Sequence, residues 1–357
     1  DASFFAGGDR YVTRPSPDSH SPRIRIIQGK DSVAIEQHRP SVLSSLTGLP
    51  VERALTLIPN LLPVCGLAQS VAASRAVEAA RGEAPDPERE HARERALRRE
   101  QALSAGWRLA VDWADLLDRP RTLIWLKALR HSENHADCAG VLMSAVPGLD
   151  SVWSLDDLTR WAQEEDNHAA GIIREALEHD HPNTEAGKCL TGQDLASTAR
   201  DLLAQEAFNP LTPRGGAVEV GPLAMRREPL IETHACQLAA TSAGRLRALV
   251  LDTRQIIGNL RADSDSRQEN TQAWQECAGT GTGCATTARG PVFHRVTLDP
   301  QDQVAQWRAL APTDWHFAPG GPVTQALTGK PQNRASMLAI AGFDPCAPWS
   351  LESDGGD

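Results

Sequence analysis

The chain lacks an apolar run long enough to cross a lipid bilayer, although 41% of its 357 residues are hydrophobic. Its first residues, Asp1 to Phe5, have neither the basic region nor the apolar run of a secretory signal peptide. Positive charge is in deficit as well. The formal net charge of −10 argues against a nucleic-acid partner and against an anionic membrane surface. These features predict a soluble, acidic protein.

The cysteines show no pairing pattern. There are seven, an odd number, scattered widely through the chain, and a chain of this length can bury a core without disulfides. Without an export signal, this usage predicts reduced thiols and a cytoplasmic location. The cysteines stand at positions 65, 138, 189, 236, 277, 284 and 346.

Apolar periodicity and breaker residues predict a helix-dominant α+β fold with a few short strands. A hairpin is expected around the turn Gln28–Asp31, and residues 1–22 are expected to form a loose arm. The polar stretch 254–287, which is rich in Gly and Thr in its second half, is predicted to be a long surface connection. Helices are predicted over 42–62 with a break at 48–50, from 66 to about 82, and over 88–117, 122–145, 155–162, 169–177 and 192–205.

Two short cysteine stretches are the strongest candidates for chemistry. Cys65 stands where a loop meets a helix of small residues, and a helix N-terminus favours the thiolate form that binds metals or reacts. Cys346 follows Asp344 and Pro345 near the end of the chain. The alternative for Cys65 is that of most free cysteines, a small apolar residue that fills a gap in the core.

Other candidates are weaker. His131, His135 and Cys138 fall at helical spacing on one predicted face, which suits zinc but also suits a polar helix end. The Gly/Thr-rich stretch 279–283 has the composition of a phosphate loop, but no Lys-Ser/Thr pair follows it, so it is predicted to be flexible. No Ser/His/Asp order or nucleophile elbow indicates a hydrolase.

The cysteine stretches resemble the two metal-binding motifs of the large subunit of [NiFe] hydrogenases, Arg-x-Cys-Gly-x-Cys-x-x-x-His and Asp-Pro-Cys-x-x-Cys-x-x-His. In the stretch 60–69 (NLLPVCGLAQ), Cys65 falls on the second cysteine, Leu62 on the first and Gln69 on the histidine. In the stretch 344–352 (DPCAPWSLE), the first cysteine is Cys346. Trp349 falls on the second cysteine of that motif and Glu352 on its histidine.

Three internal stretches also resemble motifs of that subunit. Residues 213–224 (PRGGAVEVGPLA) match a Pro-Arg…Glu-Val-Gly-Pro-Leu-Ala segment, and 311–316 (APTDWH) match Pro-Thr-x-Trp-Asn. Arg289-Gly290 followed by His294 matches an Arg-Gly-x-x-x-His segment, whose arginine overhangs the metals. With degenerate cysteine motifs in this order, the chain most resembles the HupK (HoxV) family of hydrogenase expression/formation proteins. No motif can be placed between about 85 and 205.

The resemblance implies a large-subunit-like fold over 23–352, with a central helical bundle, short peripheral strands and a tail over 353–357. It also implies a non-catalytic factor that carries or shields an Fe(CN)₂CO unit transiently, without nickel, because two of the four metal-binding thiolates are missing. Cys65 and Cys346 become candidate iron ligands, and Arg289 a candidate donor to a cyanide nitrogen. In the enzyme, the second cysteine of each motif binds the iron. Cys346 falls on the first cysteine of its motif, so it would have to take over the role of the second.

The partners implied are maturation proteins of the HypC type and the large-subunit precursor. Two alternatives remain open at this point. One is a metal-free chaperone that mimics the large subunit and binds a maturation partner. The other is an active hydrogenase with a rearranged site. Arg289 also has a structural alternative, an ion pair without a ligand. If Cys65 and Cys346 share one iron, the C-terminal segment must pass into the interior beside the helix that begins near Gly66.

Overall fold

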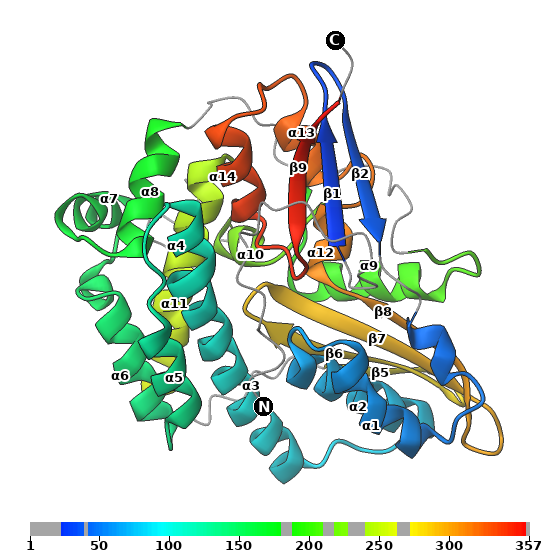
Figure 1. Ribbon diagram of the computed structural model, residues 1–357. Coiled ribbons are helices and arrows are strands. Elements are labelled where there is room, and N and C mark those ends of the chain that lie inside the picture. Colours follow the sequence, from blue (N-terminus) through cyan, green and yellow to red (C-terminus); the bar gives the residue numbers. More distant parts are fainter. Residues whose placement is uncertain are drawn as a thin grey trace.

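The helices between residues 87 and 178 and the helix 242–262 gather on one side of the molecule, whereas the strands lie on the other side together with the helices 66–81 and 192–204 (Figure 1). The computed structural model describes residues 23–38, 42–179, 188–209, 218–227, 240–262 and 272–354. The predicted arm 1–22, residues 213–217 of one internal motif and residues 355–357 of the predicted tail lie outside the described residues. The helix-dominant α+β class is confirmed.

The helices carry the labels of Figure 1. The α-helices are α1 (Val51–Leu61), α2 (Gly66–Arg81), α3 (Pro87–Trp107), α4 (Trp113–Leu116), α5 (Leu123–His131), α6 (His135–Ala145), α7 (Leu155–Glu164), α8 (His168–Glu178), α9 (Gly192–Ala204), α10 (Pro222–Arg227), α11 (Ser242–Ala262), α12 (Pro312–His316), α13 (Pro322–Leu327) and α14 (Arg334–Gly342). Short 3₁₀ turns cover Val42–Leu46 (η2) and Leu149–Ser151 (η4), and a π-turn covers Arg108–Asp112 (η3).

Within the described ranges, the strands form three sheets. They are β1 (Arg23–Gln28), β2 (Val33–His38), β3 (Lys188–Cys189), β4 (Val218–Glu219), β5 (Ala273–Cys277), β6 (Thr280–Thr287), β7 (Gly290–Leu298), β8 (Val304–Leu310) and β9 (Trp349–Ser353). β1 and β2 form the predicted antiparallel hairpin, and β9 pairs with β1 in parallel, Ile24 opposite Trp349. The antiparallel order β5-β6-β7-β8 forms the largest sheet, and β3 pairs with β4.

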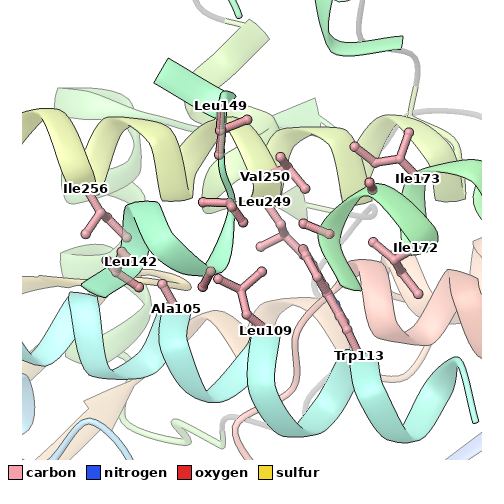
Figure 2. Packing of buried hydrophobic residues seen from close by; sticks show 14 of the residues in the cluster. Ala105, Leu109, Trp113, Leu142, Leu149, Ile172, Ile173, Leu249, Val250 and Ile256 are labelled. Carbon is pink, nitrogen blue, oxygen red and sulfur yellow. The ribbon is translucent and has the colours of Figure 1, made fainter. Parts of the chain in front are cut away.

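The helical side has its own apolar core. Leu109 and Trp113 follow α3 and point toward Leu249 and Val250 of α11, while Ile172 of α8 closes the same cluster (Figure 2). All five side chains are buried, and each large apolar side chain removed from water contributes about 1.5–3 kcal/mol. This core holds α3 and α11 against each other.

The predicted surface connection over 254–287 is wrong at both of its ends, and residues 263–271 between them lie outside the described residues. α11 continues to Ala262, and the Gly/Thr-rich stretch is β6, a buried strand that lies against α2. A Cβ at Gly283 would lie 2.2 Å from the carbonyl oxygen of Ala72, so only glycine lets the strand and the helix approach this closely. Glycine here serves close packing of backbones, whereas sequence alone suggested flexibility.

The single helix predicted over 122–145 is also corrected. Ser132 to Asn134 separate α5 from α6, and the Asn134 side chain accepts from the amide of Asp137 at the start of α6. The other predicted helices occur with boundary shifts of a few residues. Among the described residues, no helix is both long and apolar enough to span a membrane.

Candidate functional site

Cys65 lies at the junction of α1 and α2 in an unusual backbone conformation. It is the N-cap residue of α2 and has φ 57°, in the left-handed region that residues with a Cβ rarely adopt. Its side chain makes no capping hydrogen bond to the helix. Glu100 of α3 caps the helix in its place. Its two carboxylate oxygens accept from the amides of Leu67 at 2.8 Å and Ala68 at 3.0 Å. The sulfur of Cys65 is therefore directed away from its own helix.

Arg289 occupies the tight turn between β6 and β7 and faces Cys65. Its Nη1 donates to Cys65 Sγ at 3.5 Å, and its Nε donates to the carbonyl oxygen of Asp344 at 3.0 Å. The turn is supported by Gly221, where a Cβ would lie 2.2 Å from the carbonyl oxygen of Arg289. The glycine of the Glu-Val-Gly-Pro-Leu-Ala motif thus packs directly against the backbone of the turn that carries Arg289.

The C-terminal loop approaches the same point from α14. Asp344 also has a left-handed backbone, with φ 45°, and its buried carboxylate accepts from Arg108 Nη2 at 2.8 Å. Two residues later, Cys346 Sγ accepts from the hydroxyl of Thr313 at 3.1 Å. Asp344 anchors the loop in the interior, as expected for the segment that presents Cys346.

The electrostatics of the site contradict the simple expectation of a thiolate. Burial raises the pKa of the Cys65 thiol to about 11, although Arg289 beside it lowers the value. Glu100 and Cys346 raise it further. The helix N-terminus does not activate the sulfur because Glu100 occupies the amides of the first turn. At neutral pH, Cys65 is a neutral thiol in the absence of a ligand.

The carboxylates of the site differ in charge state. Burial, and then the charge of Asp344, raise the pKa of Asp112 to about 7. Burial also acts to raise the pKa of Asp344, but Arg108 and Arg289 together hold it below its ordinary value. Asp344 therefore carries a negative charge that pairs with both guanidinium groups, and Asp112 sits near the midpoint of its titration at neutral pH.

Sequence analysis placed Cys65, Cys346 and Arg289 in one site, and the structure brings all three together. Each thiol influences the pKa of Arg289, and Cys346 influences that of Cys65. Their proposed ligand roles remain a prediction. Trp349 begins β9 and packs against the apolar cluster of Ile24, Phe317 and their neighbours.

Three further residues escaped the sequence analysis because they belong to the stretch 85–205 without motifs. Glu100, Arg108 and Asp112 all come from α3 and the π-turn that follows it. His168 Nδ1 donates to the Leu109 carbonyl at 2.8 Å, inside the turn that carries Arg108 and Asp112. One feature of the sequence could have indicated two of these residues: the charged Arg108 and Asp112 lie four residues apart, on one face of the apolar half of the predicted helix 88–117.

A buried network lies beside the site, around the position that has a histidine in the large-subunit motif. Gln69 Oε1 accepts from His294 Nε2 at 2.6 Å, and His294 Nδ1 accepts from Trp307 Nε1 at 2.9 Å. The indole can only donate, so His294 carries its proton on Nε2. Burial lowers the pKa of His294 to about 3, and the ring is neutral at physiological pH.

The zinc hypothesis for His131, His135 and Cys138 is wrong in its premise of one helical face. His131 ends α5, where its Nδ1 bonds the carbonyl of Lys127, and His135 begins α6, where its Nε2 bonds the carbonyl of Arg95. Cys138 is buried in the helical core. Within the described part of the chain, no three or more His, Cys, Asp or Glu side chains are grouped to hold a metal ion.

Known relatives agree with the predicted resemblance. No protein-family model matches the chain. It is 28% identical over 353 residues to the hydrogenase expression/formation protein HupK of Bradyrhizobium diazoefficiens, covering 90% of this chain and 92% of that protein. It is 29% identical over 364 residues to the hydrogenase expression/formation protein HoxV of Cupriavidus necator, covering 89% and 92%.

Solved structures agree on the fold. An NAD⁺-reducing [NiFe]-hydrogenase in the H₂-reduced state superposes with a TM-score of 0.53 at 16% identity, covering 94% of this chain and 98% of that chain. The [NiFeSe] hydrogenase of Desulfovibrio vulgaris Hildenborough gives 0.54 at 14% identity, covering 89% and 93%. The chain is thus a relative of the HupK/HoxV proteins with a [NiFe] hydrogenase large-subunit fold, as the motifs predicted.

Proposed function

We propose that this protein is a non-catalytic maturation factor that carries or shields an Fe(CN)₂CO unit while the large subunit of a [NiFe] hydrogenase is assembled. The name shared by its relatives, hydrogenase expression/formation protein, supports the maturation role. The proposed partners are maturation proteins of the HypC type and the large-subunit precursor, and the proposed location is the cytoplasm.

One observation carries the proposal: the Cys65 junction, the Arg289 turn and the C-terminal loop with Cys346 converge, although they are far apart in sequence. Soft thiolates suit a low-valent iron, and an Fe(CN)₂CO unit brings three ligands of its own. Two protein sulfurs are then enough to hold it. The Arg289 guanidinium, already 3.5 Å from Cys65 Sγ, is a suitable donor to a cyanide nitrogen.

Nickel fits the donor set poorly. Leu62 and Trp349 stand where the resembled motifs have thiolates, and neither side chain can coordinate a metal. The iron unit is therefore the cargo, and the sulfurs must lose their protons to bind it, because Cys65 rests as a neutral thiol.

A second candidate function is a metal-free chaperone that mimics the large subunit. It is favoured by the fact that both sulfurs already have protein partners, Arg289 for Cys65 and the Thr313 hydroxyl for Cys346. In this case the same loops would keep the large-subunit shape for a maturation partner.

Metal analysis of protein purified anaerobically from its native host tests the proposal. Iron without nickel, with infrared bands of cyanide and carbon monoxide, is the expected result. Absence of metal would instead support the chaperone, and iron together with nickel would indicate a hydrogenase with a rearranged site.

A further inference from the structure

The first turn of α2 needs hydrogen-bond acceptors that its own N-cap residue does not supply. The first amides of a helix have no partner within the helix, and an N-cap side chain usually accepts from the second or third of them. Here those residues are Leu67 and Ala68, and the N-cap is Cys65. Both amides bond the Glu100 carboxylate of α3, at 2.8 and 3.0 Å.

We propose that Glu100 is a positioning residue for Cys65: by capping α2 from outside, it leaves the sulfur free to face Arg289 and the C-terminal loop. The inference rests on the proposed function to the extent that Cys65 receives the iron unit. Without Glu100, the two amides lose the acceptors that the structure gives them, and we expect the sulfur of the N-cap residue to compete for these amides and to turn away from Arg289.

The surroundings of Glu100 support this assignment. The next residue, Gln101, donates from Nε2 to the carbonyl of Thr286 at 3.0 Å, so α3 is tied to β6 just before the Arg289 turn. One segment of α3 thus fixes α2 through Glu100 and the neighbouring sheet through Gln101. The negative charge of Glu100 is met by the positive end of the α2 dipole and by Arg289.

Three variants test the role. Glu100→Ala removes the cap, Glu100→Gln keeps one carbonyl oxygen that can accept, and Glu94→Gln is the matched control. Glu94 lies on the same helix but pairs with Arg75, at 2.8 Å, away from the α2 amides. Circular dichroism first verifies that each variant is folded.

The first measurement is iron retained per protein after anaerobic purification. Residues that orient a metal ligand typically contribute tenfold or more to metal affinity, so Glu100→Ala is expected to retain about tenfold less iron than wild type. Glu100→Gln is expected to recover a large part of the loss, and Glu94→Gln to match wild type. If Glu100→Ala retains as much iron per protein as the wild type, the proposal is overturned.

The second measurement needs no metal. Iodoacetamide labelling of the metal-free protein, resolved by peptide mass spectrometry, compares Cys65 with the exposed Cys277 as internal reference. In Glu100→Ala, the sulfur turned to the helix N-terminus is expected to react about tenfold faster, because that position favours thiolates. An unchanged ratio would overturn the positioning role.

The two measurements separate the two proposals. If the wild type holds no iron but the labelling ratio rises in Glu100→Ala, Glu100 positions Cys65 and the iron-carrier function fails. If the wild type holds iron while Glu100→Ala keeps both its iron and its labelling ratio, the carrier function stands and the positioning role fails.

Discussion

Cys65 combines two features that are costly for a single residue. Its left-handed backbone costs about 1–3 kcal/mol for a side chain with a Cβ, and its half-buried thiol is held neutral with a pKa raised to about 11. Such a conformation persists only where the surrounding structure requires it. Asp344, close to the second thiol, has the same backbone conformation. Both loops of the site are thus held in shape by their neighbours, Glu100 and Arg108.

Replacing Cys65 by serine tests its role as a ligand. Serine is nearly isosteric, so the fold should persist, but a soft sulfur donor becomes a poor, hard oxygen donor. Cys65→Ser is expected to lower hydrogenase activity at least about tenfold in a strain that depends on this protein. Cys277→Ser, at an exposed cysteine, should have no effect. Normal hydrogenase activity with Cys65→Ser would reject the ligand role.

The buried His294 makes stability depend on pH. Its pKa is about 3 in the fold, against 6.5 in the unfolded chain, so below pH 6.5 the unfolded chain binds a proton that the folded chain does not. The contribution to stability is therefore present above pH 6.5 and is lost as the pH falls toward 3, by about 1.4 kcal/mol per pH unit.

The variant His294→Gln isolates this contribution. Other titrating groups, Asp112 and His316 among them, are common to both proteins and cancel in the comparison. Urea unfolding at pH 7.5, 6.0 and 5.0 should show the stability advantage of the wild type shrinking by about 1–1.5 kcal/mol per pH unit below 6.5. Parallel pH profiles for the two proteins would contradict the assignment of a neutral, buried ring.

At the scale of elements, the contact of α2 with β6 sets the position of the Cys65 junction. The strand approaches the helix backbone at Gly281 and Gly283, and the facing residues of α2 include Ala72 and Ala76. A helix lined by alanine and a strand interrupted by glycine can lie closer than larger side chains allow. The N-terminus of α2 is thereby held beside the Arg289 turn that ends β6.

Gly283→Ala tests this contact. The new methyl group would meet the Ala72 carbonyl, so α2 must shift, and overpacking of this kind costs about 1–3 kcal/mol. The control is Gly140→Ala in α6, where a Cβ meets nothing within 4 Å and helix propensity favours alanine by about 1 kcal/mol. The melting temperature should fall for Gly283→Ala and rise for Gly140→Ala. An unchanged melting temperature for Gly283→Ala would show that the contact between strand and helix is loose.

At the scale of the whole molecule, the large-subunit fold is kept, while two of the four cysteine positions in the resembled motifs hold Leu62 and Trp349. The metal ligands are the reaction centre of a metalloenzyme, and Leu62 and Trp349 cannot replace thiolates. We expect the purified protein neither to oxidise nor to produce hydrogen. Hydrogen-dependent dye reduction should not exceed that of a chelator-treated sample, and activity above that level would indicate a working metal centre.

The sequence by itself determined the helix-dominant class, the hairpin around 28–31 and the kinship, because these depend on local periodicity, turn residues and ordered motifs. It also indicated Cys65, Cys346 and Arg289 through those motifs. Only the tertiary structure decided that the Gly/Thr-rich stretch is a buried strand. Its glycines are needed because the backbone of α2, which is distant in sequence, lies too close to leave room for a side chain. The same holds for Glu100, Arg108 and Asp112, whose roles come from contacts across the fold. The charge state of Cys65 was decided there too, because burial and the cap from Glu100 outweigh the local effect of a helix N-terminus.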